Sequence, residues 1–147
     1  MYNEAIKAAR NSKDPSTKVG CVIVGQDNEI VSSGCNGMVS GSDEKYLPFV
    51  APMKYRVVVH AEMNAIISAK QNLEGCTMYV TDAPCEQCLK HILQAGIRTV
   101  YYGSTAILKR WNDKEGIEAI KNLLLSMSDA NVVNWYTMEP LSSELGL

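Results

Sequence analysis

Four side chains that can bind a metal or transfer a proton occur in two short motifs near the middle of the chain. His60 and Glu62 are two residues apart in "VVVHAEMNAIISAK", where an apolar run gives way to helical spacing. Cys85 and Cys88 are three residues apart in "APCEQCLK", directly after a proline that favours the first turn of a helix. Both motifs therefore place reactive side chains at the predicted start of a helix.

The two cysteines form half of a metal site, because residues three apart lie on one face of a helix. The partial positive charge at a helix N-terminus lowers the pKa of a thiol and favours the thiolate that a metal needs. If the strands before the two helices are neighbours in the sheet, both helix starts meet at one edge, and His60 becomes the third ligand. The pattern predicts a Cys2His zinc site with one open position.

Zinc at such a site would lower the pKa of a bound water molecule toward neutrality. Glu62 follows His60 by two residues and is directed differently, so we expect it to be a general base rather than a ligand. In a deaminase the zinc-activated hydroxide attacks the carbon that bears the amine, and one glutamate carries every proton. His-x-Glu together with Pro-Cys-x-x-Cys is the signature of the zinc deaminases.

Each motif alone also has a simpler interpretation. Paired cysteines occur without a metal, His60 could be a hydrogen-bonded core residue, and the helix dipole alone favours a carboxylate at Glu62. A closed structural zinc site is a stronger rival, since His91 could complete a Cys2His2 set. Against it, about 9 Å of helix rise separates Cys85 from His91, too far for one tetrahedral ion. We expect His91 to be an ordinary helix residue.

The hydrophobic pattern predicts the elements that hold these motifs. A short helix is expected at 2–10, and two strands at 19–24 and 29–34 flank a hairpin turn. Periodicity fails between 35 and 56, which predicts a long loop. Further helices are expected at 60–70, 84–96 and 113–127, alternating with strands at 76–82, 97–103 and 132–138. This order predicts an α/β domain in three layers, with helices on both faces of a mixed sheet.

Composition narrows the class of protein. The chain has 147 residues, of which 46% are hydrophobic, enough for one domain with its own core. Fourteen basic and sixteen acidic residues give a net charge of −2, which argues weakly against nucleic-acid binding. No window suits a signal peptide or a membrane span, and five cysteines do not suggest a disulfide framework. We expect a single cytoplasmic domain, residues 1–147, without membrane or nucleic-acid partners.

From about Asn11 to Gly103 the chain resembles the zinc-dependent cytidine and deoxycytidylate deaminases. The matching pieces are "NSKDPSTKVGCVIV", "SSGCNG", "HAEMNAI" and "TMYVTDAPCEQCLKHILQAGI", in that order. The zinc motifs are typical of the superfamily, whereas "SKDPSTKVG" and "QAGI" indicate the deoxycytidylate branch. The resemblance implies a cytidine-deaminase-like fold with a five-stranded mixed sheet, and hydrolysis of dCMP to dUMP and ammonia.

The resemblance also implies roles for individual residues, beginning with the zinc ligands and the proton shuttle named above. Asn36 matches a residue that binds the substrate sugar, and Ala61 matches one whose backbone contacts the pyrimidine. The segment after the fourth strand lacks the tyrosine expected to cover the base, and the nearby candidates are Tyr101, Tyr102 and Trp111. Ligands for a second zinc have no counterpart, so one zinc ion per subunit is expected.

A nucleotide substrate needs cations for its phosphate. The cations that flank the pocket segments are Lys13, Lys18, Lys54 and Arg56. We expect Arg56 to bind the phosphate, because it is closest in sequence to the His-x-Glu motif and arginine forms bidentate phosphate contacts.

Members of the family are typically homohexamers regulated by nucleoside triphosphates. The resemblance implies dCTP as activator and dTTP as inhibitor, with Mg²⁺ accompanying the triphosphate. The implied effector site lies near the loop after the second strand, at Gly34, Cys35, Gly37 and Gly41. This loop reads Gly-Cys-Asn-Gly where the family usually has Gly-Tyr-Asn-Gly.

Other functions are compatible with the same motifs. A tRNA adenosine deaminase shares both of them but needs a broader cationic surface than this composition provides. A deaminase of free cytidine or of another small base also fits. Outside the enzymes, the alternative is a structural zinc-binding interaction module, and Glu62 argues against it because a structural site gives that carboxylate no role.

Overall fold

The central sheet has five strands in the order β2–β1–β3–β4–β5. β1 (Gly20–Val24) pairs antiparallel with β2 (Ile30–Cys35) and with β3 (Thr77–Asp82). From β3 onward the sheet continues in parallel through β4 (Thr99–Ser104) and β5 (Asn131–Asn134). This computed structural model describes residues 1–146, and it confirms the five-stranded mixed sheet predicted from the sequence.

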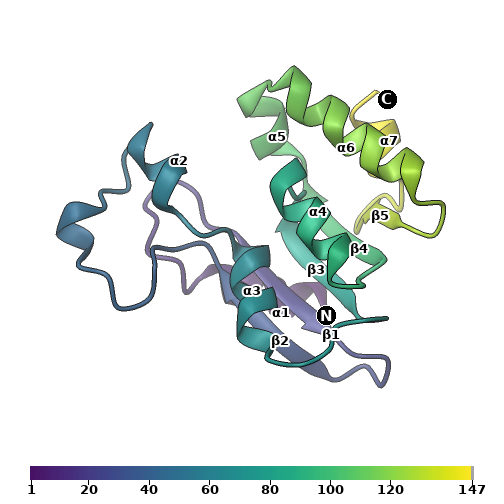
Figure 1. Cartoon of the computed structure of the whole chain (residues 1–147), viewed down its shortest axis with the longest axis horizontal. Helices are drawn as coiled ribbons and strands as arrows, with labels where there is room; N and C mark the ends of the chain where they lie inside the picture. The colour runs from purple at the N-terminus through teal and green to yellow at the C-terminus, as the bar shows by residue number, and fades with distance from the viewer. Residues whose placement is uncertain (147) are drawn as a thin grey trace.

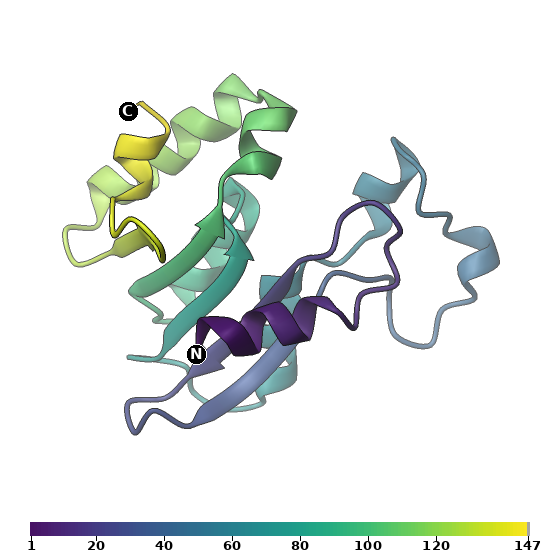
Figure 2. The ribbon, with the colours of Figure 1, turned by 180° about the vertical axis from the view of Figure 1, so that it is seen from behind.

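Helices cover both faces of the sheet, as Figures 1 and 2 show from opposite sides. On one face α1 (Tyr2–Ala9) packs against β1 and β3, and on the other α3 (Ala61–Ala69) packs against β1 and β2. α4 (Glu86–Gln94) lies beside α3, and α6 (Lys114–Ser126) packs on α4. The predicted three-layer α/β/α architecture is therefore confirmed.

The alternation of side chains along β1 explains the two helical layers. Cys21 and Ile23 point to the side of α3 and α4 and belong to the main hydrophobic core. Val22 and Val24 point to the opposite side, where they pack with Ala5 of α1. All five residues of β1 are buried, as expected for a central strand covered on both faces.

Two glycines allow the helices to lie directly on the sheet. A Cβ atom at Gly20 would come within 2.0 Å of the Ala5 carbonyl oxygen in α1. A Cβ atom at Gly34 would come within 2.6 Å of the Ala61 carbonyl oxygen in α3. Neither contact is possible for a real side chain. Gly34, which the resemblance assigns to the effector loop, thus also sets how closely α3 approaches β2.

The segment predicted as a long loop contains two short helices. They are the 3-10 helix η1 (Glu44–Tyr46) and α2 (Met53–Val57). The strand expected before His60 is absent: α2 ends at Val57, and Val59 makes only an isolated bridge with Gly37. Helices of three and five residues are too short for a periodic pattern to indicate them. Residues 37–57, which we call the arm, project away from the sheet in both views (Figures 1 and 2).

The C-terminal third also differs from the sequence prediction. Two helices were not expected, α5 (Ala106–Trp111) after β4 and α7 (Leu141–Glu144) near the end. The strand expected at 132–138 is shorter and ends at Asn134. There the Asn134 side chain accepts hydrogen bonds from the backbone N–H groups two and three residues later, which turns the chain out of the sheet.

Candidate active site

The structure brings His60, Cys85 and Cys88 together where α3 and α4 begin. His60 is the N-cap residue of α3, and Cys85 is the N-cap residue of α4. His60 Nδ1 lies 3.2 Å from Cys88 Sγ and 3.7 Å from Cys85 Sγ. Tetrahedral zinc with ordinary bond lengths holds such atoms roughly 3.5–3.8 Å apart. The three residues therefore fit one zinc ion, and the meeting of the two helix starts is as expected from the sequence.

Hydrogen bonds among these three side chains favour loss of a thiol proton. The Cys88 thiol donates to Cys85, and this bond, helped by His60, lowers the pKa of Cys85 to about 4 in spite of burial. The same bond, together with burial, raises the pKa of Cys88. A metal dication displaces such a retained proton when it binds. The thiolate and imidazole donors are those that zinc prefers.

Glu62 lies beside the metal-binding set, in the first turn of α3. Its side chain is 4% exposed and lines the cavity in front of the three ligands. Burial raises the pKa of its carboxyl group to about 7, against the opposing effect of His60. A bound cation would favour the charged form. Among the described residues, the metal-binding set consists of His60, Cys85 and Cys88, whose ligand atoms lie within 4.8 Å of one another. Glu62 is not part of this set, so its carboxylate can exchange protons.

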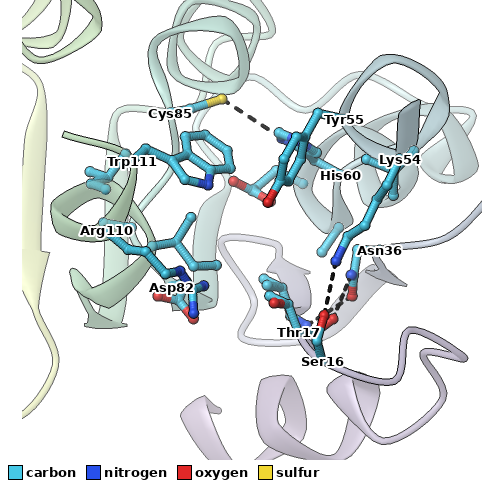
Figure 3. A pocket seen from close by; sticks show the side chains of 17 residues that line it. Ser16, Thr17, Asn36, Lys54, Tyr55, His60, Asp82, Cys85, Arg110 and Trp111 are labelled. Atoms are coloured by element: carbon cyan, nitrogen blue, oxygen red, sulfur yellow. Dashed lines mark hydrogen bonds between the residues drawn. The ribbon is translucent and has the colours of Figure 1, made fainter. Parts of the chain in front are cut away.

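The cavity has a volume of about 220 Å³, and His60 and Cys85 of the metal-binding set line it (Figure 3). Its walls come from segments far apart in the sequence: the loop after α1, the end of β2, the arm, the starts of α3 and α4, and α5. Of the substrate-binding residues expected from the sequence, Asn36 and Ala61 line it. Arg56 is exposed and is not part of the lining, whereas Lys54 is.

Asn36 is held in a fixed orientation at the cavity wall. Its Oδ1 accepts from the Val19 backbone N–H at 2.9 Å, and its Nδ2 donates to the Thr17 carbonyl at 2.8 Å. Its own carbonyl accepts from Ser12 Oγ at 2.9 Å. An amide nitrogen carries two hydrogens, so one N–H of Asn36 is left for a ligand. The side chain can therefore act as an orienting donor.

Lys54 forms a buried ion pair with Asp14 in the same wall. Its Nζ lies 2.7 Å from Asp14 Oδ2 and 3.1 Å from Ser16 Oγ. The other Asp14 oxygen accepts from the backbone N–H groups of Ser16 and Thr17. Burial acts to raise the pKa of Asp14, but Lys54 and the backbone donors outweigh it, so the pKa is lowered. The pair joins the loop after α1 to the arm.

Replacing Lys54 with methionine should destabilise the protein by about 3 kcal/mol at neutral pH, because it leaves the wholly buried Asp14 charge unpaired. The native pair holds the folded pKa of Asp14 below its unfolded value. Its contribution is thus fully present above about pH 4 and is lost as the pH falls through the folded pKa. Urea unfolding curves from acid to neutral pH measure both effects.

Lys7 and Glu4 provide the matched control, since their 3.1 Å pair lies on the exposed face of α1. Lys7→Met should cost less than about 1 kcal/mol. Equal losses for Lys54→Met and Lys7→Met would show that the buried pair contributes no more than a surface pair.

Only one of the three aromatic residues considered for covering the base reaches the cavity. Tyr102 is fully buried beneath α7, and Tyr101 lies in an aromatic cluster on the sheet. Trp111, the last residue of α5, lines the cavity (Figure 3). Its ring centroid lies 6.2 Å from that of His60 and 6.1 Å from that of Tyr55 on the arm. Trp111 therefore spans the gap between the metal-binding set and the arm.

Two charged residues of the cavity were missed by sequence reasoning. Arg110 lies on α5, a six-residue helix that no periodic pattern indicates. Asp82 ends β3, and ligands of α/β proteins commonly bind at the carboxyl ends of strands. Its position three residues before Cys85 was therefore a signal that could have identified it.

His91 lies apart from the metal-binding set, as expected from the sequence. It is exposed on α4, where its ring nitrogen bonds to the Gln87 carbonyl at 2.6 Å. His91→Ala should leave the zinc content unchanged and keep activity within about twofold, since exposed substitutions rarely matter more. Metal analysis of the purified variant, with its turnover rate, checks this, and loss of zinc would favour a closed structural site instead.

The mixed sheet is flanked by helices, and the starts of two adjacent helices bring together one histidine, two cysteines and a buried glutamate. This arrangement defines a zinc-dependent deaminase. The model of the cytidine and deoxycytidylate deaminase zinc-binding region matches residues 1–104. The chain belongs to this family.

Individual relatives agree with this assignment. Deoxycytidylate deaminase of Mus musculus is 40% identical over 126 residues, which cover 81% of this chain and 68% of the mouse protein. Deoxycytidylate deaminase of Enterobacteria phage T4 is 35% identical over 91 residues, covering 58% of this chain and 47% of the phage protein. The crystal structure of dCMP deaminase from cyanophage S-TIM5 in complex with dCMP and dUMP matches with a TM-score of 0.64. It is 26% identical and covers 90% of this chain and 92% of the cyanophage chain.

Proposed function

We propose that this zinc-dependent deaminase hydrolyses dCMP to dUMP and ammonia. The observation that carries the proposal is the cavity, which has the metal-binding set and Glu62 at its buried end and polar and cationic residues along its walls. Relatives named deoxycytidylate deaminase and a similar structure that holds dCMP and dUMP support this choice of substrate.

Glu62 performs the proton transfers in the proposed reaction. His60, Cys85 and Cys88 would hold the zinc, which when bound supplies a Lewis acid that lowers the pKa of water at its open position. The Glu62 carboxylate would take a proton from water and deliver it to the ring nitrogen beside the amine-bearing carbon, while the remaining hydroxide adds to that carbon. It would then take the proton of the added hydroxyl group and pass it to the amine, which leaves as ammonia when the carbonyl forms. Its burial excludes bulk water from these steps.

Two further residues orient the pyrimidine nucleotide. We assign to Asn36 a contact with the sugar, because it has one amide hydrogen not used within the protein. We assign to Ala61 a backbone contact with the pyrimidine, since it lines the cavity beside His60. A phosphate contact by Arg56 stays a prediction, and its position outside the cavity lining does not support it.

Regulation by dCTP and dTTP, with Mg²⁺, is proposed from the family resemblance. The effector loop would include Gly34, Cys35, Gly37 and Gly41. A Cβ atom at either of the last two would meet nothing within 4 Å, so space for a ligand surrounds them. An increase in activity with dCTP and a decrease with dTTP would support the proposal.

A homohexamer is likewise proposed from the resemblance. Large apolar side chains on the arm are exposed, notably Val39 at 58%, Tyr46 at 72% and Val50 at 66%. Clusters of exposed apolar side chains commonly mark contacts between proteins. Light scattering on the purified protein gives the subunit number directly.

We further propose that residues 1–147 form a single domain and that the protein works in the cytoplasm. All five cysteines carry free thiols in the structure, which suits a reducing compartment. No helix among residues 1–146 is long and apolar enough to cross a membrane.

Ultraviolet absorbance tests the proposed function, because loss of the amine changes the spectrum of the base. Purified zinc-loaded protein is mixed separately with dCMP, deoxycytidine and adenosine. We expect rapid change with dCMP, slower change with deoxycytidine and none with adenosine. Faster turnover of deoxycytidine would indicate a nucleoside deaminase, and turnover of adenosine would indicate an adenosine deaminase.

A further inference from the structure

Arg110 carries a positive charge at the cavity that no ion pair within residues 1–146 neutralises. Lys54 also lines the cavity, but its ammonium is paired with Asp14 at 2.7 Å. Among residues 1–146, no carboxylate oxygen lies within 4.0 Å of the Arg110 guanidinium nitrogens. The charge of Arg110 is therefore available to an anionic ligand.

Arg110 also lies at the end of the cavity where a phosphate would be. Glu62 and Cys85 are buried at 4% and 7% exposure, whereas Arg110 is exposed. A nucleotide that brings its amine-bearing carbon to Glu62 must direct its sugar and phosphate away from it, toward solvent. In Figure 3, Arg110 lies on the α5 side of the cavity, away from the Cys85–His60 contact.

Asp82, at the end of β3, lines the cavity near the start of α5 and near Arg110. Burial raises the pKa of the Asp82 carboxyl group, while the Ile107 backbone N–H in the first turn of α5 and the charge of Arg110 lower it. Asp82 Oδ1 is buried without a hydrogen-bond partner in the described part of the chain. The Asp82 carboxylate thus attracts the Arg110 guanidinium toward the cavity, although the two groups do not form a short ion pair.

We propose that Arg110 binds the 5′-phosphate of the substrate and thereby makes the enzyme prefer a nucleotide to a nucleoside. This inference rests on the proposed deamination of dCMP. Guanidinium groups bind phosphate through two parallel hydrogen bonds, which a lysine cannot reproduce. The phosphate is remote from the reacting carbon, so the contact is the same before and in the transition state. Its loss therefore acts on KM rather than on kcat.

Steady-state kinetics with dCMP and with deoxycytidine test the proposal in the zinc-loaded protein. Arg110→Gln should raise KM for dCMP by about tenfold to a hundredfold, the range for a hydrogen bond to a charged group, with little change in kcat. Its kinetics with deoxycytidine should stay as in the wild type. Arg110→Lys should fall between the two, because it keeps the charge and loses the paired geometry.

Lys109→Gln is the matched control, since Lys109 is exposed, precedes Arg110 on α5 and does not line the cavity. It removes one positive charge at nearly the same place and should retain the wild-type preference for dCMP. Arg56→Gln tests the rival position. If Arg56→Gln loses the preference and Arg110→Gln keeps it, Arg110 is not the phosphate ligand.

Equal losses with both substrates in Arg110→Gln also overturn the proposal, because a phosphate contact cannot affect deoxycytidine. Zinc content and circular dichroism verify that the variant is folded. If it does not fold, Arg110→Lys decides, and unchanged KM for dCMP in that variant is the negative result. A wild-type protein that fails to deaminate dCMP refutes the proposed function instead, so the two failures are distinguishable.

Discussion

Glu62→Gln should reduce turnover of dCMP by at least about a thousandfold while zinc and nucleotide still bind. Glutamine has nearly the same size as glutamate, so the packing at the start of α3 is kept. It cannot accept a proton from water or deliver one to the ring. The other carboxylate that lines the cavity is Asp82, at the end of β3. Metal analysis, equilibrium dialysis with dCMP and absorbance kinetics measure the three quantities.

Glu86→Gln is the matched control for this substitution. Glu86 is also in the first turn of a helix that begins at a metal-binding residue, but it does not line the cavity. The Glu86→Gln variant should keep activity within about threefold, as expected for loss of one charge outside the cavity lining. Comparable activity in the Glu62→Gln and Glu86→Gln variants would show that Glu62 is not the proton carrier.

Cys88→Ser should release the zinc and abolish activity, and the protein should unfold at a lower temperature. Cys88 is 1% exposed and lies 3.2 Å from His60 Nδ1, so its removal takes one of three ligands from the set. A ligand that binds only the folded state stabilises it, and that stabilisation disappears with the metal. Chelation of zinc from the wild type should have the same effect, and added zinc should restore activity in the wild type alone.

Cys76→Ala separates loss of a metal ligand from loss of a buried cysteine. Cys76 is 7% exposed just before β3 and lies outside the metal-binding set. The variant should keep one zinc ion per chain and measurable activity, with a modest decrease in thermal stability. The assignment of the ligands would be wrong if Cys88→Ser kept a full zinc ion while Cys76→Ala lost it.

The metal-binding part of the site could be predicted from the sequence because its geometry is local. Two cysteines three residues apart at a helix start must lie on one face, and this constraint holds whatever surrounds the helix. His60 reaches the cysteines although the strand expected before it is absent, because α3 and α4 lie side by side on the sheet. The burial of β1 on both faces agrees with its sequence, since "GCVIV" is apolar throughout, as in a strand covered on both faces.

The substrate side of the cavity could not be predicted in the same way. It is built by α2 and α5, which have five and six residues and no recognisable period. Arg56 was chosen because it is close to His60 in sequence, but α2 turns that side chain to the surface and brings Lys54 to the cavity. Trp111, one of the candidates named from the sequence, and Arg110 reach the same cavity from α5, much later in the chain, and this contact depends on tertiary packing.

The metal-binding side and the substrate side of the cavity differ in how far their residues can be changed. The metal-binding residues stand on helices pressed against the sheet, where Gly34 leaves no room even for a methyl group, so this half of the site tolerates little redesign. The opposite wall stands on the arm and α5, which contribute no residue to the pairs between the five strands. Changes at the exposed residues of α5 should therefore alter which nucleotides the enzyme accepts, with the metal centre unchanged.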